Sequence, residues 1–255
     1  MQTMDNQKMI KEAASRIKLG KHVVFFTGAG ISTESGIPDY RSKGGIWKKF
    51  QPVYFQDFMA SRDARIKYWQ RKSELYQDLM AARPNLAHQA LVHLRGMDLL
   101  QMVITQNIDG LHQLAGLSPK LVVELHGNTM RVRCMSCNAL STIKEAQARL
   151  EAGDLAPECS CGGYLKPDTI SFGQSMPVKE MELAHTAAEN ADVFVVIGST
   201  LLVQPAASLP VLAKQRGACL IIINLSETPC DGQADILIRG KAGEVLPAIV
   251  KQITV

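Results

Sequence analysis

Two pairs of closely spaced cysteines are the strongest chemical signal in this sequence. Cys134 and Cys137 are separated by two residues, Cys159 and Cys161 by one, and 21 residues lie between the pairs. Four thiolates form the tetrahedral ligand set of a structural zinc ion and leave no coordination position open for a substrate. The second pair is one residue closer than the usual C-x-x-C spacing. We predict one structural zinc ion, with a disulfide or plain buried thiols as the alternatives.

A histidine stands between these cysteines and a run of apolar residues. His126 follows Val122–Leu125 directly and precedes Gly127, which leaves room beside the imidazole. An unperturbed histidine titrates near pH ~6.5, so it can accept a proton at neutral pH. The alternative is a structural histidine of the core, the interpretation that we keep for the five others: His22, His88, His93, His112 and His185. We predict that His126 is a general base.

A glycine-rich turn follows another apolar run near the start of the chain. Gly28 and Gly30 come directly after His22–Thr27. They would let the backbone turn sharply and approach a pyrophosphate, whose charge suits the exposed N–H groups of a helix start. Thr33 occupies the third glycine position of G-x-G-x-x-G, so a tight turn without a ligand is the alternative.

Polar side chains follow a third apolar run. Asn107 and Asp109 come after Leu100–Ile104, at the carboxyl end of a predicted strand, where open α/β folds bind ligands. An amide and a carboxylate at this position can bind ribose hydroxyls or a carboxamide. The alternative is a plain turn, which Asn, Asp and Gly favour intrinsically.

The elements that position these residues alternate between strands and helices. Six short apolar runs predict strands buried on both faces, as in a parallel sheet: His22–Thr27, Leu100–Ile104, Leu121–Glu124, Val193–Ile197, Cys219–Ile223 and Ile236–Ile238. Helical patterns occupy Asp5–Leu19, Asp63–Ala82, Leu86–Leu94, Val178–Asn190, Pro205–Arg216 and Gly243–Gln252. This alternation predicts a doubly wound α/β fold.

Two stretches interrupt the alternation. Residues 43–85 contain long helix-like sequence without a strand, and residues 131–165 contain the cysteines with one short helical pattern, Ser141–Glu151. We predict that residues 1–42, 86–130 and 166–255 form the large nucleotide-binding domain. The helical insertion 43–85 and the zinc-ribbon module 131–165 together form the small domain.

The composition is that of an ordinary globular protein, with 255 residues of which 46% are hydrophobic and 20% charged. A net charge of +4 is too small to indicate a nucleic acid or an anionic membrane as the partner. The start of the chain lacks the apolar core of a signal peptide, and the longest apolar runs are far shorter than the ~20 residues of a membrane span. We expect a cytoplasmic monomer that contacts neither nucleic acid nor membrane.

Taken in order, these motifs closely resemble the sirtuin family. The resemblance rests on Gly28–Arg41, Thr105–His112, His126-Gly127, the cysteine pairs and Gly198–Ala206, and it spans nearly the whole chain. It implies a Rossmann-like large domain, a small zinc domain and NAD as co-substrate. The implied activity is NAD-dependent protein-lysine deacylation, which consumes acyl-lysine proteins or peptides and releases nicotinamide and O-acyl-ADP-ribose.

The resemblance also implies roles for individual residues. His126 and Asn107 are the expected catalytic residues. The expected cofactor-binding residues are Gly28, Ala29, Gly30, Ile31, Thr33, Asp39, Tyr40, Arg41, Gln106, Asn107, Ile108, Asp109, Gly198, Ser199, Thr200, Asn224 and Ser226. The expected substrate-binding residues are Tyr68, Arg71, Phe172, Gly173 and Val203.

Tyr68 and Arg71 bear on the acyl group. They are three residues apart, so they share one face of a helix. By resemblance, this Tyr-x-x-Arg pattern matches sirtuins whose acyl pocket holds acidic groups, because arginine can bind a carboxylate with two hydrogen bonds. The alternative is an amphipathic helix with Tyr68 half buried and Arg71 in solvent.

Three other functions are the alternatives to deacylation. The same site could transfer ADP-ribose to a protein side chain, which sequence alone does not separate from deacylation. A non-catalytic module that binds ADP-ribose or nucleic acid would not need Asn107, Asp109 and His126 together. A classical hydride-transferring dehydrogenase needs an acidic residue ~20 positions after the glycines, in a ribose-binding setting that this chain lacks.

Overall fold

Short runs of valine, isoleucine and phenylalanine form the central sheet of the larger lobe. In the computed structural model, residues 2–39, 45 and 51–255 are described, and the expected cofactor residues Tyr40 and Arg41 lie outside them. Within the described residues, six parallel strands adjoin in the order β3 (Val122–Glu124), β2 (Met102–Thr105), β1 (Val23–Thr27), β7 (Val193–Ile197), β8 (Cys219–Ile223) and β9 (Ile236–Ile238). This is the Rossmann order, and it confirms the six predicted strands and the doubly wound fold.

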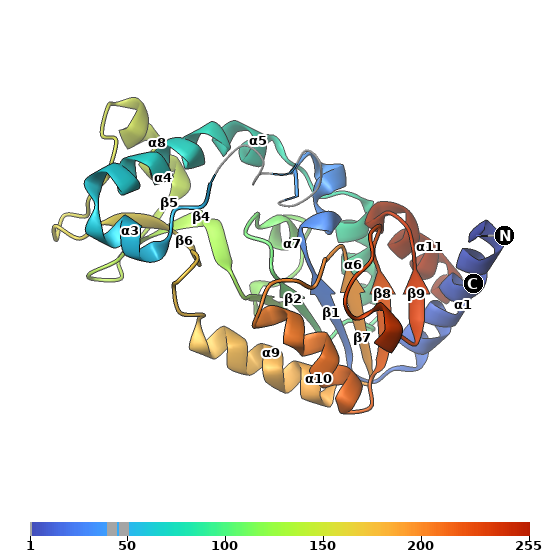
Figure 1. The fold of residues 1–255 in the computed structure, drawn as a ribbon. Coiled ribbons are helices and arrows are strands. Elements are labelled where there is room, and N and C mark those ends of the chain that lie inside the picture. The colour runs from blue at the N-terminus through green and yellow to red at the C-terminus, as the bar shows by residue number, and fades with distance from the viewer. Residues whose placement is uncertain (1, 40–44, 46–50) are drawn as a thin grey trace.

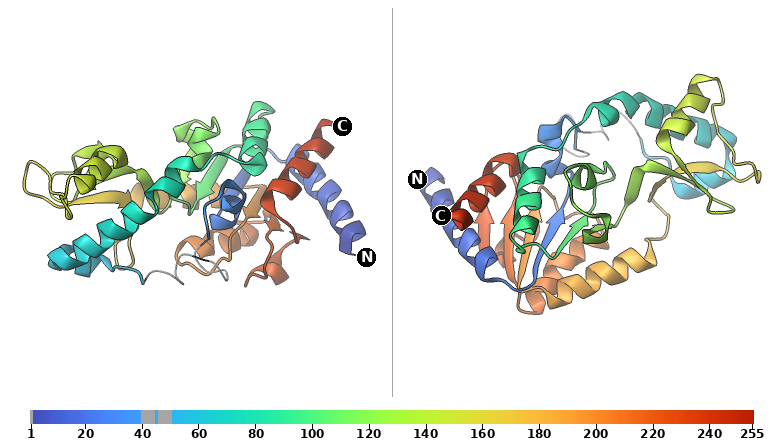
Figure 2. Two further views of the ribbon diagram at one scale, coloured as in Figure 1. Left: turned by 90° about the horizontal axis from the view of Figure 1, so that it is seen from above. Right: turned by 180° about the vertical axis from the view of Figure 1, so that it is seen from behind.

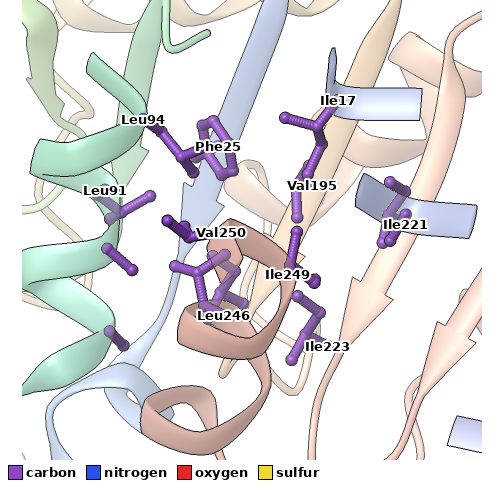
Figure 3. Packing of buried hydrophobic residues seen from close by; sticks show 14 of the residues in the cluster. Ile17, Phe25, Leu91, Leu94, Val195, Ile221, Ile223, Leu246, Ile249 and Val250 are labelled. Atoms are coloured by element: carbon purple, nitrogen blue, oxygen red, sulfur yellow. The ribbon is translucent and has the colours of Figure 1, made fainter. Parts of the chain in front are cut away.

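Helices cover both faces of this sheet (Figures 1 and 2). One face carries α1 (Gln2–Leu19), α6 (Leu86–Gly96) and α11 (Ala242–Thr254), and the other carries α9 (Val178–Asn190) and α10 (Leu209–Gln215). Neighbouring residues of β1 point to opposite faces, so Phe25 packs in the first core, where Figure 3 shows it beside Leu94, and Phe26 packs in the second. Within the described ranges, no helix is long and apolar enough to cross a membrane.

The smaller lobe combines segments from two separate parts of the chain (Figure 1). The first contributes α3 (Phe55–Ala60), α4 (Arg62–Glu74) and α5 (Tyr76–Ala81). The second contributes α8 (Ile143–Glu151) and an antiparallel sheet with the order β5 (Leu140–Thr142), β4 (Gly127–Cys134) and β6 (Leu165–Thr169). Trp69 of α4 is fully buried against this sheet, and its Nε1 donates a hydrogen bond to the Leu165 carbonyl at 3.1 Å. That buried bond joins the two segments.

The small lobe differs from the sequence expectation in two respects. The predicted helix Asp63–Ala82 is broken at Leu75, which separates α4 from α5. The small sheet runs from residue 127 to residue 169 and is wider than the predicted module 131–165, and none of its three strands was predicted. Charged residues explain the miss, because β4 carries Arg131 and Arg133 and β6 reads Leu-Lys-Pro-Asp-Thr, so neither shows clean apolar alternation.

Candidate active site

A cavity of about 640 Å³ lies at the carboxyl ends of the large sheet. Its walls include Gly30 after β1, Gln106 after β2, Gly198 after β7 and Asn224 after β8. The small lobe contributes the opposite wall, including Tyr68. The cavity therefore spans the switch point between β1 and β7, where doubly wound folds bind their ligands.

Two turns meet backbone to backbone beneath this cavity. Gly28 N–H donates to the Ile197 carbonyl at 3.0 Å, and Gly30 N–H donates to the Gly198 carbonyl at 2.8 Å. A Cβ atom at Gly28 or Gly30 would approach atoms of Gly198 to 2.7 Å, so the contact requires glycine. Ala29, Gly30 and Thr33 line the cavity, whereas the expected cofactor residues Gly28 and Ile31 are buried below it.

The loop after β2 is held by a buried hydrogen-bond network. Ser32 Oγ donates to Asp109 Oδ2 at 2.7 Å, and Asn107 Nδ2 donates to Ser32 Oγ at 3.2 Å. The Leu111 amide, at the start of α7 (Leu111–Leu114), donates to Asp109 Oδ1 at 2.9 Å. Burial raises the pKa of Asp109. The segment is thus more than a turn, because its polar side chains face inward; sequence reasoning did not single out Ser32.

Asn107 and Ile108 line both this cavity and a smaller adjoining one of about 90 Å³, while Asp109 lines only the smaller one. Ser32 lines it as well. A buried pocket with an amide, a hydroxyl and a carboxyl group suits a small planar ligand with a carboxamide, such as nicotinamide, better than an apolar one.

His126 lies where the chain passes from β3 to β4 and lines the large cavity. Its Nδ1 lies 2.9 Å from the Gln106 carbonyl. A carbonyl only accepts, so Nδ1 carries the proton and Nε2 is left as the acceptor nitrogen. Burial lowers the pKa of His126, and the bond to Gln106 partly offsets that effect. The imidazole is therefore neutral at pH 7 and can take a proton from a hydroxyl group in the cavity.

The remaining polar groups of the cavity fit a dinucleotide. Ser199 Oγ donates to Gln106 Oε1 at 2.8 Å, and Asn224 Nδ2 donates to the Ser226 carbonyl at 2.9 Å. Hydroxyl and amide groups and the backbone turn of Gly30 thus line the same cavity. The described cofactor residues that line it are Ala29, Gly30, Thr33, Asp39, Gln106, Asn107, Ile108, Gly198, Ser199, Thr200, Asn224 and Ser226.

Sequence reasoning missed part of the same wall. Gly240, Lys241 and Ala242 line the cavity between β9 and α11, and Glu34 lies across from them. Glu34 Oε2 accepts a hydrogen bond from the Gly243 amide at 2.7 Å and so caps α11 from a distant part of the chain. These residues could have been predicted to line the cavity, because Gly240 follows the carboxyl end of the last strand of the predicted sheet.

Three of the expected substrate residues form the mouth of the cavity: Phe172, Gly173 and Val203. The Phe172 carbonyl accepts a hydrogen bond from the Phe55 amide at 2.9 Å, and the Phe172 ring lies 6.1 Å from the ring of Tyr54. The mouth is therefore supported by the start of α3, which lies within the predicted helical insertion 43–85 but outside the helical pattern Asp63–Ala82.

Tyr68 and Arg71 line the cavity from α4. Tyr68 is buried, not half buried as in the amphipathic alternative, and its hydroxyl lies 3.2 Å from Thr169 Oγ1. Burial alone would raise the pKa of Tyr68, but the charges of Lys72 and Lys166 outweigh it and bring the pKa to about 8. Lys72 also lines the cavity, four residues after Tyr68, and was not predicted.

The four cysteines predicted to bind zinc converge at one end of the small sheet. Their sulfur atoms all lie within 4.8 Å of one another. Cys134 Sγ is 3.5 Å from Cys161 Sγ, and Cys137 Sγ is 3.8 Å from Cys159 Sγ, distances that are too long for a disulfide bond. Four converging thiols match the donor set of structural zinc.

Comparisons with known proteins agree with this geometry. A model of the Sir2 family matches residues 28–205. An NAD-dependent protein deacetylase of Thermodesulfovibrio yellowstonii is 46% identical over 242 residues, or 94% of each chain. An NAD-dependent protein deacylase of Pyrococcus abyssi is 42% identical over 250 residues, or 96% of this chain and 98% of the relative. A solved Sir2 complex with a deacetylated p53 peptide and 3′-O-acetyl ADP-ribose superposes with a TM-score of 0.88 at 36% identity, covering 95% of this chain and 98% of that one.

Proposed function

The chain belongs to the Sir2 family, and on that premise we propose that its interlobe cavity removes acyl groups from lysine side chains with NAD as co-substrate. The sirtuin resemblance is thereby confirmed. The observation that carries the assignment is the neutral His126, whose Nε2 is left as an acceptor in a cavity lined by Gln106 and Asn107. Acyl-lysine, NAD and one water molecule give free lysine, nicotinamide and O-acyl-ADP-ribose.

The residues of this chain bind, orient and accept a proton. When bound, NAD supplies a ribose carbon from which nicotinamide departs and to which the acyl oxygen becomes attached. Asn107 and Asp109 hold the carboxamide end, and the turn at Gly30 receives the phosphates with its backbone amides. His126 Nε2 takes a proton from a ribose hydroxyl, and its bond to the Gln106 carbonyl fixes the required tautomer.

We infer that the peptide lies at the mouth of the cavity, between Phe172-Gly173 and Val203. Both segments line the cavity, and extended segments of this kind bind peptides through main-chain hydrogen bonds. Gln174, the residue after Phe172-Gly173, is uncharged and offers no carboxylate to a basic side chain of the peptide.

The charges around Tyr68 favour an acidic acyl group. Arg71 and Lys72 line the cavity beside it, and the Lys72 and Lys166 amines lie 5.7 and 5.5 Å from the Tyr68 ring centre. Burial lowers the pKa of Lys72, whereas Arg71 stays charged, and a wall with these two groups attracts a carboxylate and disfavours a long aliphatic chain, because burying charged groups against hydrocarbon is costly. We propose succinyl- or glutaryl-lysine as preferred substrates over acyl groups without a charge.

The test of the activity is mass spectrometry of the products formed from NAD and acetyl-, succinyl- and myristoyl-lysine peptides. We expect O-acyl-ADP-ribose in stoichiometric amounts with free lysine. His126→Ala should abolish deacylation while ADP-ribose still binds in calorimetry, and His185→Ala, an exposed position on α9, should behave as wild type. Full activity of His126→Ala would remove this residue from the mechanism, and labelled NAD incorporated into protein would favour ADP-ribosyl transfer.

The acyl preference is tested separately. Tyr68→Phe and Lys72→Gln should lower kcat/KM on the succinyl peptide roughly tenfold or more, and leave the acetyl peptide within about threefold, because a hydrogen bond to a charged group contributes about 1.5–3 kcal/mol. Equal rates of the wild type on both peptides would contradict the proposal.

A further inference from the structure

The chain crosses between the lobes at the residue predicted to be the base. It leaves the large sheet at Glu124, the last residue of β3, and enters the small sheet at Gly127, the first residue of β4. Only Leu125 and His126 lie between them. The position of His126 relative to the large lobe therefore depends on what holds this crossing, together with the bond of its own ring to the Gln106 carbonyl.

The Glu124 carboxylate accepts hydrogen bonds from three side chains that lie near the crossing. Its Oε1 accepts from Gln113 Nε2 at 2.7 Å and from Asn128 Nδ2 at 2.6 Å, and its Oε2 accepts from an Arg131 guanidinium nitrogen at 2.7 Å. Only 13% of the Glu124 side chain is exposed. Asn128 and Arg131 belong to β4, so the carboxylate of β3 holds the strand beyond His126.

Arg131 extends this contact to the strand that returns from the small lobe. It donates from Nε to Asp168 Oδ2 at 3.1 Å, and Arg133 donates from Nε to Asp168 Oδ1 at 2.8 Å. These pairs lower the pKa of Asp168, which burial alone would raise. Asp168 lies on β6, two residues before Ile170, whose amide donates to the His126 carbonyl at 2.9 Å. A continuous series of ion-paired side chains therefore connects the two places where the backbone passes between the lobes.

The backbone around these ion pairs is also tightly constrained. Leu125 N–H donates to the Thr105 carbonyl at 3.0 Å, and Thr129 N–H donates to the Ile108 carbonyl at 2.8 Å. Gly127 has a φ of 75°, and a Cβ atom there would lie 2.0 Å from the Asp168 carbonyl oxygen. β4 and β6 also change register between Asn128 and Val132, and the bond from Arg131 to Asp168 connects the two strands across this irregularity.

We propose that Glu124 is a positioning residue for His126, and that Glu124, Arg131 and Asp168 form an interlobe latch that sets the distance between His126 and the ligands of the large lobe. None of the three latch residues lines the cavity, so the effect of the latch is on the rate of the step that needs the base and not on binding. This inference rests on the deacylase function proposed above.

The experiment compares three variants in steady-state deacylation and in ADP-ribose binding by calorimetry. Glu124→Gln keeps the size of the side chain but places an N–H against one of the three donors, and Arg131→Gln breaks the latch from its other side. Arg149→Gln is the control, because Arg149 forms an ion pair with Asp154 at 2.6 Å in the small lobe and is 42% exposed, against 41% for Arg131. All three proteins are first checked for a cooperative thermal transition.

We expect Glu124→Gln and Arg131→Gln to lower kcat roughly tenfold to a hundredfold, since a displacement of about 1 Å at a reacting group has effects of that size. KM for NAD, KM for peptide and the Kd for ADP-ribose should remain those of Arg149→Gln. A kcat equal to that of the control, or a loss of ADP-ribose binding that parallels the loss of kcat, would overturn the latch. Absence of deacylation in the wild type itself would instead contradict the proposed function, so the two failures are distinguishable. Should Glu124→Gln not fold, Arg131→Gln alone decides.

Discussion

Mild acid should destabilise this protein through two buried histidines behind the active site. His88 and His112 are 0% and 2% exposed, and their rings lie 5.1 Å apart. Burial lowers the pKa of His88 to about 4 and, with a smaller contribution from the charge of His88, that of His112 to about 3. His112 Nε2 lies 2.9 Å from Thr27 Oγ1, and its Nδ1 has no partner within the described residues. A second proton on either ring would be buried without compensation.

The sign and the size of the effect follow from these values. A histidine whose pKa is about 6.5 in the unfolded chain and lower in the folded protein binds protons preferentially in the unfolded state. The stability that each neutral histidine contributes is therefore fully present above pH 6.5. It is lost progressively as the pH drops below that value, until the folded pKa is reached. At pH 5 each histidine removes about 2 kcal/mol, and the pair about 4 kcal/mol, since one pKa unit corresponds to about 1.36 kcal/mol.

The assay is chemical denaturation of the wild type and His112→Gln at pH 7.5 and at pH 5. We expect the free energy of unfolding to fall between the two pH values by about 2 kcal/mol less in the variant. Carboxylates with a lowered pKa, such as Asp168, lose their contribution mainly below pH ~4 and so lie outside this window. Asp109, with a raised pKa, acts in the opposite direction but is common to both proteins. The same pH slope in both proteins would refute the reasoning.

Three further outcomes are expected. Removal of zinc by a chelator should shift the fluorescence of Trp69 to the red, because Trp69 and Cys134 belong to one apolar cluster, and an unchanged spectrum with zinc released would contradict this. Gly127→Ala should cost on the order of 3 kcal/mol or more in denaturation because of its backbone clash, whereas Gly153→Ala, with a φ of 94° and no atom within 4 Å, should cost only about 1–2 kcal/mol. The ratio of kcat/KM for succinyl- over acetyl-lysine should fall between pH 7 and pH 9, because Tyr68 has a pKa of about 8 and its phenolate repels a carboxylate; a constant ratio would exclude it from the acyl site.

The large lobe was predictable because its strands are uniformly apolar. β1 and β7 are buried along their full length, so Val23–Thr27 and Val193–Ile197 carry an unambiguous signal of a parallel sheet. The ligand-facing residues follow, since side chains such as Gln106 and Asn224 lie directly after such strands. The four cysteines could be predicted as candidate zinc ligands from their spacing alone.

The small lobe was not predictable in the same way because its strands gain stability from pairs across the sheet. Arg133 in β4 is satisfied by Asp168 in β6, 35 residues later, and no local pattern encodes that contact. Lys166 is fully buried and donates to main-chain carbonyls, where a lysine would normally indicate a surface. Lys72 and Glu34 were missed for a related reason, as charged residues in helical or turn segments are usually solvated.

The buried bond between Trp69 and Leu165 constrains how this chain can fold during synthesis. The two residues are 96 positions apart, so the helix that carries Trp69 emerges from the ribosome long before the strand that covers it. Until then Trp69 has no partner from the small sheet, and of the six strands of the large sheet only β2 and β3 lie in the intervening segment. The helix therefore exposes an apolar side chain while this segment is synthesised, but the small sheet ends at Thr169 and can form before β7, β8 and β9 of the large sheet are made.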